Sequence, residues 1–218
     1  MKMLKALSIA ITLLLLMSQA ASAQAPQWKN ADYDAVRDFS IQSNPNGVWS
    51  YGWESTLGGP LTLYPWGGTC NGSPGMSWWA TPGCPGPLIG HNDGDKTLCY
   101  FTWCVPITNL LLHPGPSGEL TVLRWTAPSQ GRFLMAVNFV GLDYQYPTTT
   151  YVHVLLNSKR SFLKAPITSY QWPLSFAPIS LQLCPGDTVD FIVDWGKDGD
   201  YTGDSTGAEV KIWKLAQH

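Results

Sequence analysis

Hydrophobic residues recur at every second position along most of this chain, which is the spacing of a β-strand with one buried face. The cleanest run places Phe133, Met135, Val137 and Phe139 on one face and polar side chains on the other. The same alternation predicts strands over residues 119–126, 152–156, 179–183, 189–195 and 210–214. Turn-forming sequences such as Pro185–Asp187 separate the runs, so we expect few helices.

A sheet with one hydrophobic face must bury that face against another layer. In the segment 119–126, Leu123 and Trp125 share one face, whereas Leu120 and Val122 share the other. We therefore predict an all-β fold, an antiparallel two-sheet sandwich of the jelly-roll type. The length favours a single sandwich domain over residues 39–218, preceded by an N-terminal extension over residues 24–38.

Residues 64–116 break the pattern, because they are rich in Gly, Pro, Cys and Trp and show no clean alternation. Long structureless loops are uncommon in compact domains, so we interpret this region as an insertion held by disulfides. We expect one short strand in it, over Leu98–Val105.

The first 23 residues have the order of a secretory signal peptide. Lys2 and Lys5 precede an apolar run over residues 6–17, and the small residues Ala21 and Ala23 complete an A-x-A cleavage site. The run of about 12 residues is too short to span a bilayer as a helix. We expect a secreted protein, extracellular or periplasmic, with no membrane anchor in the mature chain.

The cysteines of an exported protein are expected to oxidise. We predict the local pairs Cys70 with Cys84 and Cys99 with Cys104, which leave Cys184 unpaired, while the sequence alone leaves other pairings open. A zinc site is disfavoured because the chain has no C-x2-C pair.

The charge balance argues against nucleic acid as a partner. Removing Lys2 and Lys5 from the 13 basic residues leaves 11 against 15 acidic ones, a formal charge of −4 with histidine neutral. A surface that follows phosphates needs the opposite balance.

Four segments together resemble a bacterial secreted β-sandwich domain that is common in extracellular proteins carrying a PEP-CTERM sorting signal. They are FSIQSNPNGVWSYGW (39–53), LLHPGPSGELTVLRWTAPSQGRF (111–133), TTTYVHVLLN (148–157) and LCPGDTVDFIVDWGKDGDYTGDSTG (183–207). The resemblance implies a jelly-roll-like fold similar to carbohydrate-binding modules, with no established catalytic residues. This chain departs from the pattern in lacking the sorting tail, in its cysteine-rich region and at Cys184.

Aromatic residues are the first candidates for ligand binding, because the C–H face of a sugar stacks on an aromatic ring. Strand alternation places Trp49, Tyr51 and Trp53 on one face, although packing in the core explains this row better. The tryptophans of the insertion are stronger candidates because loops gather at the ends of a sandwich. They are Trp66, Trp78, Trp79 and Trp103. Adjacent Trp78 and Trp79 should point to opposite sides of a strand, so only one can face a ligand.

Acidic residues near the C-terminus form a candidate calcium site. Asp198, Asp200 and Asp204 have the spacing of EF-hand ligands, but strands in place of helices flank them. A looser loop site would use Asp194, Asp198, Asp200 and Asp204. A solvated acidic hairpin is the alternative that we favour.

No pattern of catalytic residues emerges. His91 with Asp93 and Asp95, and Ser117 in GPSGE, lack the context of a triad or a nucleophile elbow. We therefore expect a secreted, non-catalytic module that binds a polysaccharide or glycan through exposed aromatic rings. The alternatives are a structural or interaction protein of the envelope or extracellular matrix and, less favoured, a glycan hydrolase.

Overall fold

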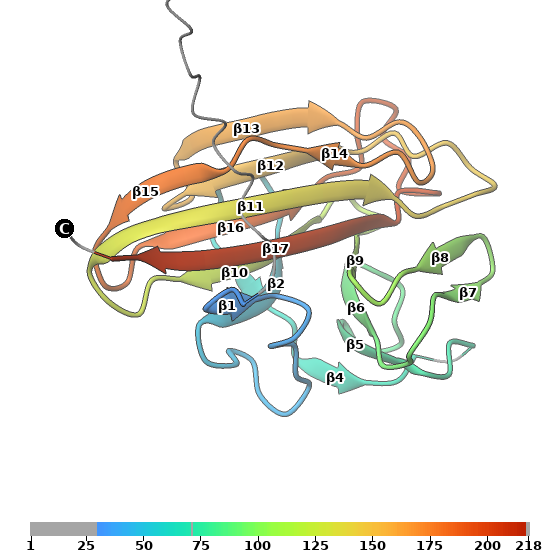
Figure 1. Cartoon of the computed structure of the whole chain (residues 1–218). Coiled ribbons are helices and arrows are strands. Elements are labelled where there is room, and N and C mark those ends of the chain that lie inside the picture. Colours follow the sequence, from blue (N-terminus) through green and yellow to red (C-terminus); the bar gives the residue numbers. More distant parts are fainter. Residues whose placement is uncertain (1–29, 71, 217–218) are drawn as a thin grey trace, which may run out of the picture.

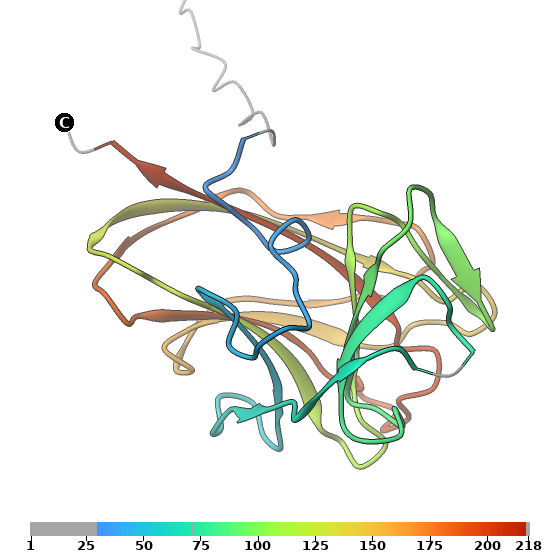
Figure 2. The same cartoon turned by 90° about the horizontal axis from the view of Figure 1, so that it is seen from below.

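The computed structural model of the protein describes residues 30–70 and 72–216, and these residues form strands, turns and loops. Two large antiparallel sheets pack face to face (Figure 1), and Figure 2 shows them as two layers, one above the other. The predicted all-β sandwich is confirmed. The predicted signal peptide over residues 1–23 and the start of the extension, 24–29, lie outside the described residues. In the described ranges no helix is long and apolar enough to cross a bilayer.

One sheet has nine strands and the other has six. The nine-stranded sheet runs in the order β14 (Leu174–Ser175), β11 (Gly131–Gly141), β17 (Thr206–Leu215), β9 (Leu110–His113), β6 (Leu88–Asn92), β5 (Met76–Ala80) and β4 (Trp66–Gly68), with β1 (Tyr33–Asp34) on β17 and β15 (Ile179–Leu183) on β11. The six-stranded sheet runs in the order β13 (Arg160–Pro166), β12 (Tyr151–Leu156), β16 (Thr188–Val193), β10 (Leu120–Thr126), β2 (Trp49–Glu54) and β3 (Thr62–Leu63).

The alternating segments of the sequence are strands in the structure. The predicted runs coincide with β10, β11, β12, β15, β16 and β17. Leu123 and Trp125 of β10 face the core between the sheets, whereas Leu120 and Val122 pack on the outer side of the six-stranded sheet. The opposite faces predicted for these residues are therefore confirmed.

The main core lies between the two sheets and is rich in aromatic rings. Trp125 of the six-stranded sheet meets Phe133 of the nine-stranded sheet with ring centroids 5.1 Å apart and the rings edge to face. Edge-to-face geometry brings the positive edge of one ring onto the negative face of the other. These contacts bridge the two layers and fix how they face each other.

Residues 64–116 contain six strands, where we predicted one. β4, β5, β6 and β9 extend the nine-stranded sheet. β7 (Leu98–Tyr100) and β8 (Trp103–Val105) form a separate hairpin over the segment predicted as a single strand, so that prediction is corrected. The missing alternation has a physical cause: Leu110, Leu111 and Leu112 of β9 are all buried, because both faces of this part of the sheet are covered.

The β7–β8 hairpin covers a second, smaller core on the outer side of the sheet (Figure 1). Trp78, Met76 and Leu111 are buried there, and Trp103 and Tyr100 of the hairpin pack against them. The hairpin is attached to the end of β11, because Cys104 N–H donates to Leu142 O at 3.0 Å and Tyr144 N–H donates to Thr102 O at 2.8 Å. The second core therefore depends on both disulfide-containing segments and on β11.

A buried carboxyl group lies on the outer side of the six-stranded sheet. Glu54 Oε1 accepts a hydrogen bond from Gly58 N–H at 2.9 Å, while Oε2 is buried without a partner among the described residues. Burial raises the pKa of Glu54 to about 7, and Asp190 acts in the same direction. Asp190 itself is paired with Arg124 at 2.5 Å.

We expect the contribution of Glu54 to the stability of the folded protein to grow as pH falls from about 8 to about 5, because its buried site suits a neutral carboxyl group. Buried His113, whose pKa is lowered, acts in the opposite direction, so the Glu54 contribution is measured as the difference between the wild type and a Glu54 variant. The folded pKa of Glu54, about 7, lies above the ordinary value of 4.5, so its stabilising contribution is complete below about pH 4.5 and is lost as pH rises towards 7. Asp204, whose pKa is also raised to about 7, adds to the same trend. The gain should be about 2 kcal/mol, or several degrees in thermal melts.

The substitution Glu54→Gln should raise the melting temperature at about pH 8 and flatten the pH dependence, because it supplies a neutral side chain of the same shape. Glu209→Gln, at a half-buried glutamate on β17, is the matched control and should leave the slope in place. An equal pH dependence of the melting temperature in the wild type and in Glu54→Gln would contradict the burial of a neutral Glu54.

Candidate binding site

Several of the aromatic residues predicted to stack on a ligand belong to the main core. Trp49 and Tyr51 are buried between the sheets, and Trp53 packs against the same core. Trp79 also faces it, and its Nε1–H donates to Ser40 O at 2.8 Å. Core packing, the interpretation preferred for the row of Trp49, Tyr51 and Trp53, therefore describes the buried rings of Trp49 and Tyr51, and Trp79 is buried in the same way. Trp53 is only partly buried.

The other predicted residues, Trp66, Trp78 and Trp103, gather around the second core. Trp78 lies on the opposite side of β5 from Trp79, as strand geometry requires. The rings of Trp78 and Trp103 meet at 5.8 Å with an angle of 80°. They form a corner, which differs from a flat pair of coplanar rings.

A cavity of about 300 Å³ opens at this corner. Trp78, Leu88 and Leu111 belong to β5, β6 and β9, and Trp103 comes from the hairpin. His113 of β9 and Phe101 of the β7–β8 turn also line it, and three loops supply the rest: Cys70 and Ser73 before β5, Gly83–Gly86 after it, and Tyr201 and Ser205 before β17. The cavity thus lies where the hairpin, the disulfide-containing loops and the loop after β16 converge.

One wall of the cavity is the disulfide between Cys70 and Cys84. The second bond joins Cys99 to Cys104 across the β7–β8 hairpin, and Cys184 is free and exposed. These are the pairs expected from the sequence. Gly83 and Gly86 take φ values of +89°, which place the loop in a backbone region that favours glycine.

Phe101 stands at the rim of the cavity with 71% of its surface exposed. It occupies the turn between β7 and β8, and its ring lies so close to Gly72 that a Cβ there would be 2.9 Å from the ring. Gly72 therefore leaves the space that the ring needs. A large, solvent-exposed hydrophobic side chain is unusual in a turn, where small or polar residues are preferred.

The polar lining of the cavity is neutral. His113 Nδ1–H donates to Pro114 O at 2.8 Å, because a carbonyl oxygen only accepts. Burial lowers the pKa of His113, so the ring is neutral near pH 7 and its Nε2 is an acceptor with no partner in the described part of the chain. The ring meets Tyr201 edge to face at 5.7 Å.

None of the described residues that line the cavity is Asp, Glu, Lys or Arg. The site therefore offers aromatic faces, hydroxyl groups and one imidazole acceptor, and it offers no formal charge. Such a lining suits an uncharged ligand with both C–H faces and hydroxyl groups.

The sequence reasoning missed Phe101, His113, Tyr201 and Ser205. One signal for Phe101 was present, because the close spacing of Cys99 and Cys104 requires a tight hairpin whose tip projects. His113 and Tyr201 are far apart in the sequence, and only the packing of β9 beside β17 brings them together.

The four aspartates of the predicted calcium site each make hydrogen bonds to different parts of the protein. Asp194 accepts hydrogen bonds from His153 Nε2–H at 2.9 Å, Tyr151 N–H and Gly196 N–H, and these bonds hold its pKa below its ordinary value although burial acts against them. Asp198 and Asp200 cap turns in the exposed loop.

Asp204 is fully buried, and its Oδ1 accepts from Thr149 N–H at 2.8 Å. Burial raises the pKa of Asp204 to about 7, and the charges of Asp198 and Asp194 add to the rise. Within the described ranges no three His, Cys, Asp or Glu side chains gather in a metal-binding group. Calcium binding by these residues stays a prediction. The loop they shape carries Tyr201 and Ser205 to the cavity.

The geometry of a catalytic triad is not formed at His91. Its Nδ1 contacts Asp93 Oδ1 at 2.7 Å, but the nearby Ser77 Oγ–H donates to Asp93 Oδ2 at 2.6 Å. In a triad the serine must contact the histidine, so this serine is not activated. Ser117 N–H donates to Glu119 Oε2 in the turn before β10, which is no nucleophile elbow.

No protein-family model and no curated protein matches the sequence. Solved structures match it at low likeness. A secreted serine protease, VesC, from Vibrio cholerae is 17% identical with a TM-score of 0.35, over 58% of this chain and 24% of the protease. A carbohydrate-binding module from Clostridium perfringens, in complex with methyl-galactose, is 13% identical with a TM-score of 0.38, over 69% of this chain and 95% of the module.

A carbohydrate-binding module of a Cellvibrio mixtus lichenase, in complex with cellotriose, is 11% identical with a TM-score of 0.27, over 67% of this chain and 92% of the module. At these TM-scores the likeness carries no information on ligand or activity, so function is inferred from the side chains of this chain. The association with PEP-CTERM proteins stays a prediction.

Removing the disulfide in the cavity wall should destabilise the protein. In the chain-entropy description, a bridge with a sequence separation of 14 residues contributes about 3 kcal/mol, and one with a separation of 5 residues contributes about 2 kcal/mol. The double variant Cys70→Ala/Cys84→Ala should therefore melt at a lower temperature than Cys99→Ala/Cys104→Ala. Cys184→Ser, at the free cysteine, should match the wild type. Equal melting temperatures for all three variants would show that neither bridge forms.

Proposed function

We propose that the protein is an extracellular, non-catalytic carbohydrate-binding module that holds a neutral sugar ring in the cavity beside Trp103, Trp78 and His113. The observation that carries this proposal is the lining of the cavity, which combines aromatic rings with neutral hydrogen-bonding groups and no charge. The two disulfides fit an extracellular setting.

A sugar has both an apolar C–H face and polar hydroxyl groups, and the cavity lining offers partners for each. The C–H face of a pyranose ring stacks on an aromatic face, here that of half-buried Trp103, while the edge of Trp78 closes the floor. Its hydroxyl groups find an acceptor in His113 Nε2 and hydroxyl partners in Tyr201 and Ser205. A volume of about 300 Å³ lies at the small end of ligand sites, which suits one or two sugar rings.

The same lining disfavours bond cleavage as the role of this cavity. Glycoside hydrolysis ordinarily needs two carboxyl groups beside the scissile bond, one of them a proton donor. The described residues around the cavity provide neither group. The buried Glu54 lies on the other sheet and outside the cavity lining. Binding without turnover is therefore the activity that these side chains support.

The test is a glycan array followed by titrations monitored by intrinsic tryptophan fluorescence. The wild type should bind at least one neutral glycan, and Trp103→Ala should weaken that binding about tenfold or more, as expected for an aromatic anchor. Trp213→Ala, at a half-buried tryptophan of β17 outside the cavity, is the control and should bind like the wild type. Thermal melts verify that both variants fold.

Absence of binding to every neutral and acidic glycan would contradict the proposal and favour a structural protein of the envelope. A parallel titration in EDTA separates the roles of calcium and sugar. A lower melting temperature in EDTA would support calcium in the acidic loop independently of any glycan, because a cation that binds only the folded state stabilises it.

A further inference from the structure

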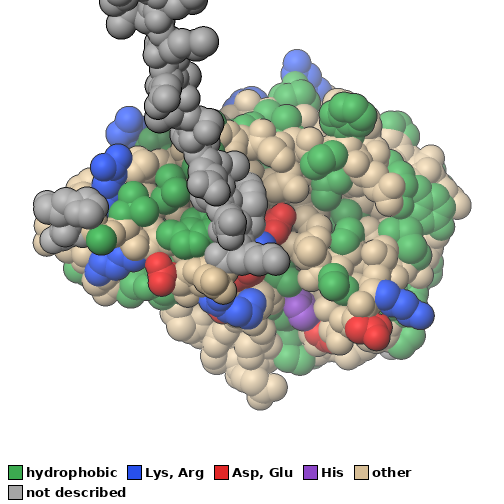
Figure 3. Space-filling model, in the orientation of Figure 1, with side chains coloured by type: hydrophobic (Ala, Val, Ile, Leu, Met, Phe, Trp, Pro, Cys, Tyr) green, Lys and Arg blue, Asp and Glu red, His purple; other side chains and the backbone are tan. Residues whose placement is uncertain are grey.

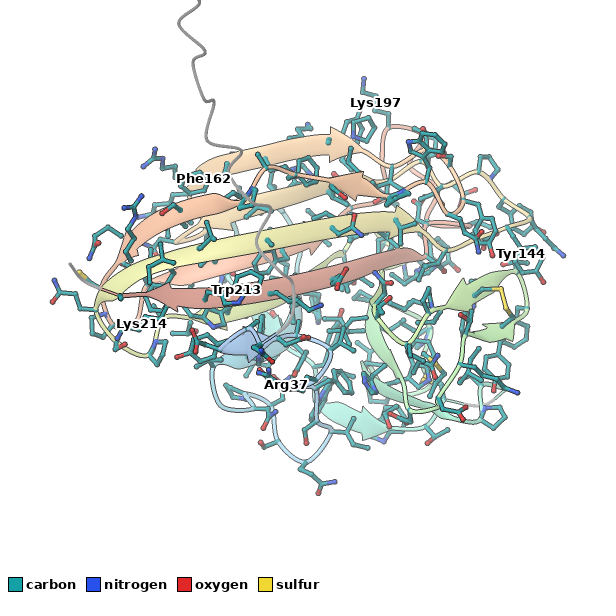
Figure 4. All side chains as sticks on the ribbon, in the orientation of Figure 1. Arg37, Tyr144, Phe162, Lys197, Trp213 and Lys214 are labelled. Atoms are coloured by element: carbon teal, nitrogen blue, oxygen red, sulfur yellow. A yellow bond between two sulfur atoms is a disulfide. The ribbon has the colours of Figure 1, made fainter. Side chains whose placement is uncertain are left out.

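A group of exposed aromatic side chains adjoins the rim of the cavity. We call Tyr144, Tyr170 and Trp172 the aromatic platform. Tyr144 is 46% and Trp172 is 76% exposed, while Tyr170 is half-buried. Tyr144 lies at the end of the molecule beyond β8 (Figure 4). Tyr144 and Tyr170 are in ring contact, and Trp172 follows Tyr170 by two residues in the same loop. Exposed aromatic side chains that lie together are typical of contact surfaces.

The platform is attached directly to the cavity rim. Tyr144 Oη–H donates to the carbonyl oxygen of Phe101 at 2.7 Å, and Phe101 lines the cavity. The rings of Tyr144 and Tyr170 meet edge to face at 6.0 Å. Tyr144 is therefore fixed to the backbone of the residue at the cavity rim, and its ring is in contact with that of Tyr170.

Backbone hydrogen bonds hold the platform in place. Tyr144 N–H donates to Thr102 O at 2.8 Å, and Gln171 N–H donates to Gly141 O at 3.0 Å. The second bond fixes the loop between β13 and β14 against the end of β11, next to Trp172. A surface that is already ordered loses little entropy when a ligand binds.

The platform carries no formal charge of its own. Asp143 is the one charged residue of the segment 141–151, and it is buried with its carboxylate bound to Thr102 Oγ1 and to the backbone of residues 145 and 146. Residues 168–180 contain no Asp, Glu, Lys or Arg. In Figure 3 hydrophobic side chains occupy much of the right-hand rim, while most Lys and Arg side chains lie elsewhere. Gln145 and Gln171 supply amide groups beside the rings.

We infer that the ligand is a neutral polysaccharide chain, with one sugar in the cavity and the following sugars laid across the aromatic platform. This inference rests on the proposed function, because it assigns the chain length and charge of the ligand of the same site. The cavity alone suits one or two rings, whereas the platform extends the same uncharged, aromatic surface beyond the rim. A polysaccharide that contacts the cavity and the aromatic platform at the same time gains from both contacts. Its affinity should therefore grow with the number of sugars until the polysaccharide spans both areas.

The experiment measures binding by calorimetry to glucose, mannose, xylose and galactose and to their β-1,4-linked oligosaccharides up to the hexasaccharide. For the sugar that the wild type binds, affinity should rise with chain length and then level off. Trp172→Ala should weaken hexasaccharide binding about tenfold and leave monosaccharide binding unchanged, and Tyr144→Ala should also weaken hexasaccharide binding about tenfold. Trp103→Ala should weaken both, and the control Trp213→Ala neither.

The outcomes separate the two proposals. Equal affinity for the monosaccharide and the hexasaccharide, with no effect of Trp172→Ala, would overturn the platform and leave the cavity site standing. Absence of binding to every sugar would overturn both, and the platform would then be a protein-docking surface. Because Trp172 is so exposed, its replacement should leave the melting temperature unchanged, which keeps the test valid if Tyr144→Ala folds poorly. Tighter binding to a uronic acid hexasaccharide than to the neutral chain would also contradict the inference.

Discussion

The burial of β9 on both of its faces is the constraint on which the rest of the structure depends. Leu110 and Leu112 point into the main core, and Leu111 points to the outer side of the same sheet, where it would meet water without further cover. The β7–β8 hairpin and the disulfide-containing loops supply that cover. Their packing over the outer face of the sheet produces the cavity, so the candidate binding site exists because this face is covered.

The sandwich itself could be predicted from the sequence because its strands have one hydrophobic face. Phe133 to Phe139 and Val189 to Val193 alternate cleanly, and each becomes a strand that buries its apolar face in the main core. The rule fails at β5, β6 and β9, since strands covered on both sides lose the alternation that identifies them. Composition then made these strands resemble a loop-rich insertion.

The candidate site was accessible to sequence reasoning only in part. Trp78 and Trp103 were predicted as candidates because loops gather at the ends of a sandwich, and both line the cavity. Adjacent Trp79 could not be told apart from Trp78 until the face of β5 on which each lies was known. His113, Tyr201 and Ser205 come from segments that meet only through the pairing of β9 with β17. The spacing of the acidic residues allowed a calcium site beside the favoured acidic hairpin, but it could not predict the partners of Asp194 and Asp204. These are His153 and Thr149, which lie more than 40 positions away in the sequence.

The covalent link between Cys70 and Cys84 has a consequence for when the protein acquires its recognition surface. Both sulfur-bearing residues line the cavity, so the wall is complete only once the two thiols have been joined. Reducing compartments keep thiols apart, and oxidising ones join them. The complete wall is therefore expected to form in an oxidising compartment, where the bond between Cys70 and Cys84 can be made and kept.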